Sequence, residues 1–219
     1  MKNLCKACQG ELIKAGKQKN GTQRYVCKQC RKYQQLDYKN NACQVGTSSL
    51  VNIYLEGCGI ISLGRIFGIS PSTVLNKIKQ ATNQVKKPVK FPPYQSYEID
   101  EMHTFVGQKD RQIWITYAME RTSKQVVDFV VGSRNKENLA HVVNSILANN
   151  PKRIYTDHLN IYPTLIPKGV HRPSRFMTNS IERLNLTLRT HLKRLSRKTI
   201  CYSRSKHLLE ASLQLYFWQ

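Results

Sequence analysis

The stretch YEIDEMHTFV, residues 97 to 106, largely alternates apolar and polar side chains as a β-strand does, and it holds three carboxylates within four residues. Acids are scarce elsewhere, because the chain has 13 acidic residues against 35 basic ones and a formal net charge of +22. The alternation puts Asp100 on the same face as Glu98, and Glu101 on the opposite face. At most two of these acids therefore share a site, and a site at Asp100 must draw its other ligands from elsewhere in the chain.

The segments that follow predict an α/β fold. RQIWITYAM (residues 111–119) and QVVDFVV (residues 125–131) are apolar, β-branched or aromatic runs bounded by turn signals, which is typical of strands. NKENLAHVVNSILANN (residues 135–150) has apolar residues at helical spacing, and KRIYTD (residues 152–157) is a candidate short strand. An irregular loop is expected over residues 166–179, followed by a long basic helix. This order indicates a three-strand meander that leads into a parallel strand.

Two further carboxylates lie where such a fold gathers functional groups. Asp157 closes the short strand, and the carboxyl end of a strand is the usual functional position in α/β sheets. Glu182 lies in the first turn of the basic helix, which begins near Ser180, at the edge of an apolar stripe. Each acid also has a purely structural explanation: a turn for Asp157, and a capping box with Asn179 for Glu182. The residues of the stripe that are expected to be buried are Ile181, Leu184, Leu188, Leu192 and Leu195.

Three carboxylates together make a candidate site for two Mg²⁺ ions, because hard cations take oxygen ligands and leave room for phosphate. The members of this candidate site are Asp100, Asp157 and Glu182. Asp128, in the third predicted strand, is a weaker fourth candidate. We expect the other two acids of the opening stretch, Glu98 and Glu101, to be solvated or paired with nearby Lys side chains.

The charge is segregated along the chain. Nine of the 13 acidic residues lie between Glu98 and Glu182, whereas residues 57–97 hold no acid, and residues 183–206 hold eight Lys or Arg and no acid. Such a net charge is usually offset by a polyanion such as nucleic acid. An anionic membrane is the rival partner, but the sequence has neither a run of 18 apolar residues nor a signal-peptide core at its N-terminus. We therefore expect a soluble, intracellular protein with a packed core and no membrane partner.

Two cysteine pairs near the N-terminus predict a zinc ribbon over residues 1–42. Four thiolates at this spacing suit a tetrahedral structural zinc site, and metal binding would supply folding energy that so short a segment lacks. The alternative is a set of buried free thiols or a redox pair. The predicted ligands are Cys5, Cys8, Cys27 and Cys30, and basic neighbours such as Arg24 and Lys28 favour a phosphate-bearing partner. The other three cysteines, expected to be packing residues, are Cys43, Cys58 and Cys201.

A helix-turn-helix is predicted within residues 43–85, in the run GIISLGRIFGISPSTVLNKIKQATNQV (residues 59 to 85). A tight turn at Gly68-Ile69-Ser70 separates two helices, with Ser70 as the cap of the second and Pro71 at its first position. The alternative is an ordinary helical hairpin. A Pro-rich linker is expected over residues 86–96. The side chains predicted to face DNA are Ser72, Thr73, Asn76, Lys77 and Gln80.

The residues quoted above resemble those of a known family. The runs TNSIERLNLTLRTHLKRLSRKTICYS, YEIDEMHTFVG and YTDHLNIYP, together with the ribbon NGTQRYVCKQC, are similar to the bacterial insertion-sequence-one transposases over nearly the whole chain, and IERLNLTLRT is the most specific segment. The resemblance implies a DDE recombinase with a ribonuclease-H-like catalytic domain at residues 97–219, behind the ribbon and the helix-turn-helix. Asp100, Asp157 and Glu182 match the family motif, with 24 residues between the last two. His103 departs from it, since tryptophan is expected there.

The resemblance also implies an activity and its partners. The enzyme would bind the terminal inverted repeats of an insertion sequence, free 3′-hydroxyl ends and join them to target DNA by two-metal phosphoryl transfer. Its partners would be double-stranded DNA and at least one further copy of the chain, in the bacterial cytoplasm at the nucleoid. The basic residues expected to contact DNA through the C-terminal helix are Arg189, Lys193, Arg194 and Arg197. Two histidines, His158 and His171, lie near enough to the motif in sequence to assist, although a lone histidine is more often structural or a phosphate contact.

Two other functions remain open from the residues. The first is a non-catalytic DNA-binding regulator of the element, although the presence of all three carboxylates argues against it. The second is a structure-specific DNA nuclease of the same fold, although two DNA-binding modules ahead of the acidic region favour a transposase that reads sequence.

Overall fold

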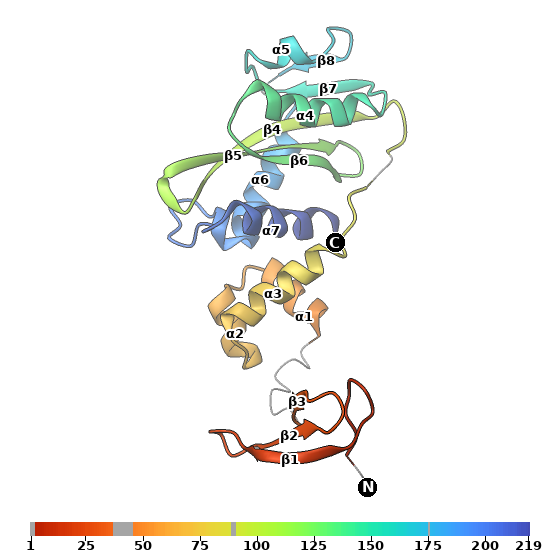
Figure 1. Cartoon of the computed structure of the whole chain (residues 1–219). Helices are drawn as coiled ribbons and strands as arrows, with labels where there is room; N and C mark the ends of the chain where they lie inside the picture. Colours follow the sequence, from red (N-terminus) through yellow and green to blue (C-terminus); the bar gives the residue numbers. More distant parts are fainter. Residues whose placement is uncertain (1–2, 37–45, 89–90, 175) are drawn as a thin grey trace. The chain divides into compact units, whose positions relative to one another are not determined.

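The computed structural model describes residues 3–36, 46–88, 91–174 and 176–219 of the 219-residue chain (Figure 1). The chain divides into two compact units, Met1–Gln44 and Val45–Gln219. Among the described residues, no helix is both long and apolar enough to cross a bilayer.

The described part of the first unit, residues 3–36, is a small antiparallel sheet with few buried apolar side chains. Its strands are β1 (Leu12–Lys17), β2 (Gln23–Cys27) and β3 (Tyr33–Gln34), in that spatial order. The hairpin between β1 and β2 turns at Gly21, whose φ of +80° lies in the region that glycine favours. The buried residues of its core cluster are Cys5, Leu12 and Cys27. So small a cluster cannot offset the conformational entropy of the segment, and the unit needs another source of stability.

The second unit begins with three helices, α1 (Thr47–Leu55), α2 (Ile60–Phe67) and α3 (Pro71–Thr82). The turn between α2 and α3 has the predicted form. Gly68 adopts a left-handed conformation at the end of α2, and the Ser70 hydroxyl accepts a hydrogen bond from the Thr73 amide at 3.1 Å.

The prediction of which α3 side chains are exposed is wrong at one position. Lys77 is buried, with 7% of its surface exposed, and it lies in the same stripe as Val74 and Ile78. Lys77 follows Val74 by three positions, so the helical period brings both side chains to the buried face of α3. Lys77 is therefore not part of the surface that α3 presents to a partner.

The three helices share a core with the last helix of the chain, α7 (Lys206–Trp218). Leu215 of α7 belongs to the same buried cluster as Leu50 and Ile78, and the Tyr54 and Ser212 hydroxyls are hydrogen-bonded at 2.6 Å. Contacts thus join the segments on either side of the Pro-rich stretch. The boundaries predicted at 85/86 and 96/97 stay predictions, and the boundary at 42/43 lies outside the described residues.

The centre of the second unit is a five-stranded mixed sheet with the strand order β6-β5-β4-β7-β8. An antiparallel meander forms one side, and two strands that run parallel to β4 extend the other. The strands are β4 (Ser96–Val106), β5 (Gln108–Glu120), β6 (Val126–Gly132), β7 (Arg153–Thr156) and β8 (His171–Pro173). Strand β8 lies within the segment predicted as an irregular loop. Three residues at a sheet edge, the last of them a proline, are too few to give an alternating pattern.

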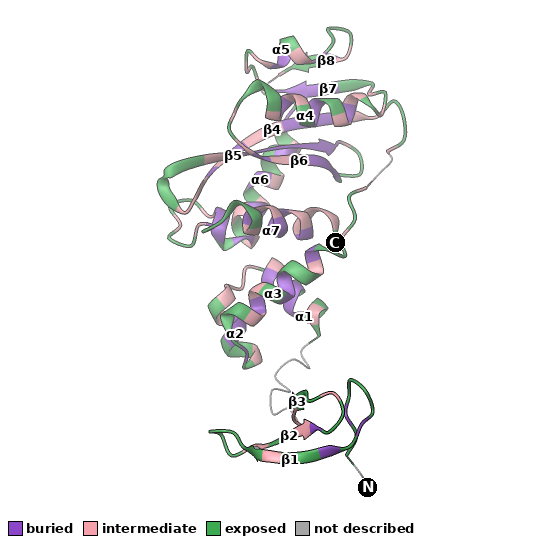
Figure 2. Cartoon of the chain, in the orientation of Figure 1, coloured by how far each residue is buried: buried purple, intermediate pink, exposed green. Residues whose placement is uncertain are grey.

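Helices cover both faces of this sheet (Figures 1 and 2). On one face, α6 (Asn179–His191) and α7 form a core with Met102, Ile115 and Tyr117. On the other, α4 (Lys136–Leu147) and the short α5 (Tyr162–Leu165) pack over Tyr97 and Ile99. Strand β4 is central and buried on both sides, so its side chains alternate between two cores as the sequence predicts.

A buried carboxylate, that of Glu120, stabilises the turn after β5. Glu120 accepts hydrogen bonds from the Thr122 amide at 2.8 Å and the Ser123 amide at 2.5 Å. Burial raises the pKa of Glu120, but the hydrogen bonds from Ser123 and Thr122 outweigh it, so the pKa lies below its usual value. Because the pKa is lower in the folded state, the stabilisation is present above the unfolded-state pKa and is lost as pH falls through the folded-state value.

We therefore predict that Glu120→Gln lowers the free energy of unfolding by about 1–2 kcal/mol at pH 7. The difference between the variant and the native chain should shrink as the pH falls below the usual glutamate range and through the lower, folded-state pKa of Glu120. Urea titrations at pH 7 and pH 3.5 measure both values. An equal difference at the two pH values would contradict this account.

Candidate active site

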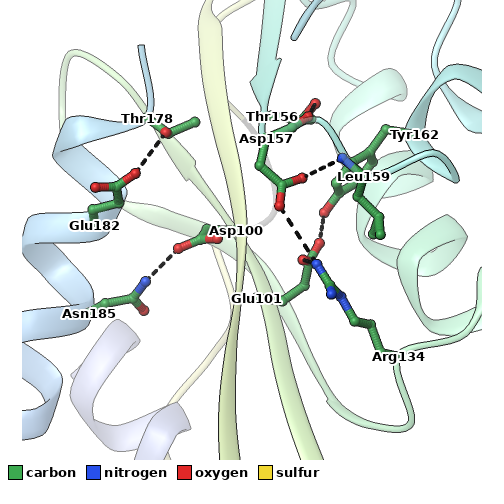
Figure 3. Close-up of polar contacts among 10 residues, drawn as sticks. All are labelled: Asp100, Glu101, Arg134, Thr156, Asp157, Leu159, Tyr162, Thr178, Glu182 and Asn185. Atoms are coloured by element: carbon green, nitrogen blue, oxygen red, sulfur yellow. Dashed lines mark hydrogen bonds and ion pairs between the residues drawn. The ribbon is translucent and has the colours of Figure 1, made fainter. Parts of the chain in front are cut away.

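Asp100 and Asp157 lie side by side because β4 and β7 are parallel neighbours. The strand register pairs Glu98 with Tyr155. Two residues further along each strand come Asp100, within β4, and Asp157, directly after β7. Asp157 lies at the carboxyl end of β7, where α/β sheets gather ligand-binding groups. Asp100 lies beside it within β4, two residues past the last pair of the β4–β7 ladder (Figure 3).

Glu182 comes to the same region on α6, which packs against the face of β4 that carries Asp100. Asn185, one turn after Glu182, donates its amide hydrogen to Asp100 Oδ2 at 2.5 Å. Residues three apart lie on one side of a helix, so Glu182 belongs to the side of α6 that faces Asp100. Glu182 itself is exposed and accepts a hydrogen bond from the Thr178 hydroxyl at 3.1 Å (Figure 3).

The electrostatics of Asp100 report a local excess of negative charge. Burial, together with the charges of Glu101 and Asp157, raises the pKa of Asp100 to about 6, although hydrogen bonds from the Glu101 amide and from Asn185 act in the opposite direction. Nearby negative charges disfavour the ionised form of Asp100, and a bound cation would offset that repulsion.

The three carboxylates do not form a closed ligand cluster. Asp157 Oδ1 accepts a hydrogen bond from the Leu159 amide at 3.0 Å, and its Oδ2 lies 3.6 Å from Arg134 Nη2. Across the described part of the chain, the one group of three or more ligand side chains within 4.8 Å of each other is formed by cysteines. The fold thus brings the three acids to one region, while Asp157 is held by a cation of the protein itself.

Glu98 and Glu101 are not solvated and do not pair with Lys, so that prediction is wrong. Glu98 is fully buried, accepts a hydrogen bond from the Ile181 amide at 2.9 Å and forms an ion pair with Arg121 Nε at 3.1 Å. The side chain of Glu101 is 1% exposed and pairs with Arg134. The partners are arginines and a backbone amide from distant segments, which local sequence does not reveal.

The structure adds residues that the sequence did not single out. Glu101 Oε2 accepts from Arg134 Nη2 at 2.7 Å, and its Oε1 accepts from the Tyr162 hydroxyl (Figure 3). Arg134 and Tyr162 lie 33 and 61 residues away from Glu101, so no local pattern links them to it. Asn185, unlike Arg134 and Tyr162, could have been predicted from the sequence, because it follows Glu182 by three residues on the buried side of α6.

Helix α6 is shorter than predicted, and its buried stripe differs. The helix ends at His191, and a 3₁₀ turn (Lys193–Leu195) follows. Asn185 is buried in α6 between Ile181 and Leu188, whereas Leu184 is only partly buried. A polar side chain fits there because Asp100 and the Tyr117 hydroxyl, at 2.8 Å, both bond to it.

Four basic residues in and just after α6 are predicted to contact DNA, and one of them, Arg194, has a structural role instead. Arg194 is 8% exposed, donates to the Ser203 hydroxyl at 2.8 Å and lies over the Tyr54 ring at 5.6 Å, so it is not available to DNA as predicted. Lys193 and Arg197 are exposed. Arg189 is partly buried. Burial lowers its pKa, as does the charge of Arg197, while Asp100 opposes them, which places Arg189 near the acidic site.

Three of the four remaining residues have structural partners. Asp128 is buried and binds Lys87 Nζ at 2.6 Å and the Ser145 hydroxyl. His171 Nε2 is 2.8 Å from the Thr156 hydroxyl, and His158 is exposed. His103 packs edge-on against two aromatic rings of the sheet, 4.9 and 5.1 Å away.

The four N-terminal cysteines form a group that fits zinc. The Sγ atoms of Cys5 and Cys30 are 3.6 Å apart and those of Cys8 and Cys27 are 3.4 Å apart, and all four lie within 4.8 Å of one another. A tetrahedral site with Zn–S bonds of about 2.3 Å has edges of about 3.8 Å, close to these separations. The Cys30 amide lowers the pKa of Cys27 to about 6 despite desolvation, and the thiolate is the form that binds metal.

The other cysteines have different surroundings. Cys58 packs against the core cluster of α1 to α3, as predicted, whereas Cys201 is exposed, so it is not a packing residue. Cys43 lies outside the described residues. Cys58 and Cys201 both line a cavity of about 900 Å³ between α2, α3 and residues 192–205, and none of the three candidate carboxylates is among the described residues that line it.

The chain belongs to the IS1 transposase family, because the family model described as IS1 transposase matches residues 95–218. The matched segment contains the whole sheet and all three candidate carboxylates, and the resemblance seen in the sequence is confirmed.

Similar proteins carry the names of insertion elements. The chain is 39% identical over 113 residues to the insertion element iso-IS1n protein InsB of Shigella dysenteriae, covering 52% of this chain and 86% of that protein. It is 37% identical over 111 residues to the insertion element IS1 4 protein InsB of Escherichia coli strain K12, covering 51% of this chain and 66% of that protein. A solved chain from a simian T-cell lymphotropic virus intasome, in complex with PP2A regulatory subunit B56 gamma, is 15% identical with a TM-score of 0.40 over 78% of this chain and 67% of that chain. A likeness this weak carries no argument.

Proposed function

We propose that this chain is a DNA transposase of the DDE type, with Asp100, Asp157 and Glu182 as the ligands of two Mg²⁺ ions. The observation that carries the proposal is the parallel register of β4 and β7, which brings Asp100 and Asp157 side by side, with α6 held beside them through Asn185. The family membership supports the same reading. We also propose that residues 97–219 form a ribonuclease-H-like domain.

The donor set suits Mg²⁺, because three carboxylates offer oxygen ligands and leave positions for phosphate. Bound there, the ions would activate water or a DNA 3′-hydroxyl and stabilise the leaving oxygen of an in-line displacement. Asn185 donates a hydrogen bond to Asp100 Oδ2 and so keeps the Asp100 carboxylate turned towards α6, the helix that carries Glu182. Arg189, seven residues after Glu182 and on the same side of α6, is placed to hold a DNA phosphate.

DNA recognition is assigned to the two N-terminal modules. We propose that α2 and α3 act as a helix-turn-helix and that residues 1–42 form a zinc ribbon. On α3, the residues Ser72, Asn76 and Gln80 are exposed, whereas Thr73 is partly buried beside the Ser70 hydroxyl. In the ribbon, Arg24 and Lys28 are exposed, with Lys28 also 2.7 Å from Glu11.

We predict that Asn76→Ala weakens binding to element-end DNA about 10- to 100-fold, because a side-chain contact to a base edge is worth about 1–3 kcal/mol. Binding to random DNA should stay unchanged, since phosphate contacts are retained. Fluorescence anisotropy with both duplexes measures this ratio. Asn83→Ala, an exposed change at the end of the same helix, is the matched control. Equal losses on both duplexes would contradict a base contact at Asn76.

Transposition joins two element ends, so we propose that the protein acts as a homo-oligomer of at least two copies. The matched family also fits a cytoplasmic protein at the bacterial nucleoid, which is part of the proposal.

The test is a strand-transfer assay with a labelled duplex that carries the element's end, in the presence of Mg²⁺. The transposase proposal expects both a cleaved 3′ end and a joined product. Cleavage without any joining would favour the structure-specific nuclease instead. Binding without either reaction would favour the non-catalytic regulator.

A further inference from the structure

Strand β4 carries three acids, and the site described above uses one of them. We propose that the other two, Glu98 and Glu101, are positioning residues: Glu98 fixes the helix that carries Glu182, and Glu101 fixes the arginine that holds Asp157. This inference rests on the proposed function, because it assigns a role in arranging the same three metal ligands.

Glu98 acts on the face of β4 that carries Asp100. Its Oε2 accepts a hydrogen bond from the Ile181 amide at 2.9 Å, and Ile181 directly precedes Glu182 in the first turn of α6. The first turn of a helix has free amide hydrogens and the positive end of the helix dipole, both of which favour a carboxylate. Its Oε1 lies 3.1 Å from Arg121 Nε, and the Arg121 guanidinium stacks on Tyr155 of β7 at 4.5 Å. Glu98 thus ties α6 to the strand that bears Asp100.

Glu101 acts on the opposite face. It binds Arg134 Nη2 at 2.7 Å and the Tyr162 hydroxyl, and that same Arg134 nitrogen lies 3.6 Å from Asp157 Oδ2. The Arg134 guanidinium also stacks on the Trp114 ring at 4.7 Å, which limits its movement. Arg134 is therefore oriented by Glu101 and Trp114, and it faces Asp157 from the side opposite to α6 (Figure 3).

Stability alone does not explain this arrangement. Buried ion pairs lose most of their attraction to desolvation, so well-packed apolar residues would serve a core at least as well. Here both carboxylates flank Asp100 in sequence, and each has partners directly beside a different one of the other two ligands. Residues that hydrogen-bond to metal ligands, or to the groups directly beside them, orient those ligands, and their loss weakens metal binding about 10- to 100-fold.

The experiment measures Mn²⁺ binding to the full chain in complex with element-end DNA, by electron paramagnetic resonance of free Mn²⁺. We expect Glu98→Gln and Glu101→Gln each to weaken Mn²⁺ binding about 10- to 100-fold, with DNA affinity unchanged. Cleavage should be partly restored by raising the Mn²⁺ concentration, which a general loss of folding would not permit. Asp110→Asn removes an exposed carboxylate from β5 and should leave Mn²⁺ binding unchanged.

A further variant keeps the test decisive if a glutamine variant fails to fold. Arg134→Lys retains the charge but loses the planar guanidinium, which stacks on Trp114 and contacts both Glu101 and Asp157 through Nη2, and it should also weaken Mn²⁺ binding about 10-fold. If native protein binds Mn²⁺ and the folded variants bind it within twofold of native, the positioning role is excluded while the proposed function stands. If neither the native protein nor Asp100→Asn binds Mn²⁺, the proposed metal site itself is wrong.

Discussion

Replacing Asp157 with asparagine is expected to lower the rate of 3′-end cleavage by about 10³-fold, which corresponds to a loss of about 4 kcal/mol of transition-state stabilisation. Asparagine keeps the shape of the side chain and can still accept the hydrogen bond that the Leu159 amide donates to Asp157 Oδ1 at 3.0 Å. The fold should therefore be preserved, and the charge that would hold a divalent ion is what the variant loses.

The measurement is a single-turnover cleavage assay with labelled element-end DNA, alongside binding of the same duplex. Binding should be retained, because Asp157 is not among the residues proposed to contact DNA bases and phosphates. Asp110→Asn is the control for removing an exposed aspartate of the same unit, and it should cleave at the native rate. Cleavage by Asp157→Asn within tenfold of native would remove Asp157 from the catalytic set.

Loss of the zinc site should unfold the N-terminal unit and leave the α/β unit folded. Cys27 is buried in the centre of the ribbon cluster, whose other buried members are Cys5 and Leu12. Because few apolar side chains are buried among the described residues of this unit, we expect metal binding to supply most of its stability. We predict that Cys27→Ser loses its one equivalent of bound zinc and makes residues 3–36 sensitive to protease, while the compact unit Val45–Gln219 resists it.

Zinc content by colorimetric chelator assay and limited proteolysis read by mass spectrometry measure the two effects. Cys201→Ser is the matched control, since Cys201 is exposed and lies outside the ligand group. A Cys27→Ser protein that keeps a protease-resistant ribbon without zinc would show that the segment folds on its own apolar contacts.

Several parts of the fold could be predicted because their signals are local. The turn between α2 and α3 depends on a glycine, a capping serine and a proline within four residues, and each has the expected role. The alternation of residues 97–106 assigned Asp100 and Glu101 to opposite faces of β4, as their partners Asn185 and Arg134 show. Cysteine spacing likewise predicted a group that the structure brings together.

The errors share a physical cause, which is that burial is decided by distant segments. Glu98, Lys77 and Arg194 were assigned to solvent or to DNA because charged residues are usually exposed. Each is buried. Glu98 is buried because a helix amide more than 80 residues away covers it, and Arg194 because the Ser203 hydroxyl and the Tyr54 ring enclose it. The sequence does not predict β8, because its three residues can be recognised as a strand only from their pairing with β7.

The most direct test of the central claim is the location of bound metal in crystals of the full chain with element-end DNA and Mn²⁺, determined by anomalous scattering. We predict two Mn²⁺ peaks, both coordinated by oxygens drawn from Asp100, Asp157 and Glu182, with Arg134 still beside Asp157. Peaks that leave any of these three carboxylates without a metal, or that lie at another part of the sheet, would contradict the assignment of these residues as a single two-metal site.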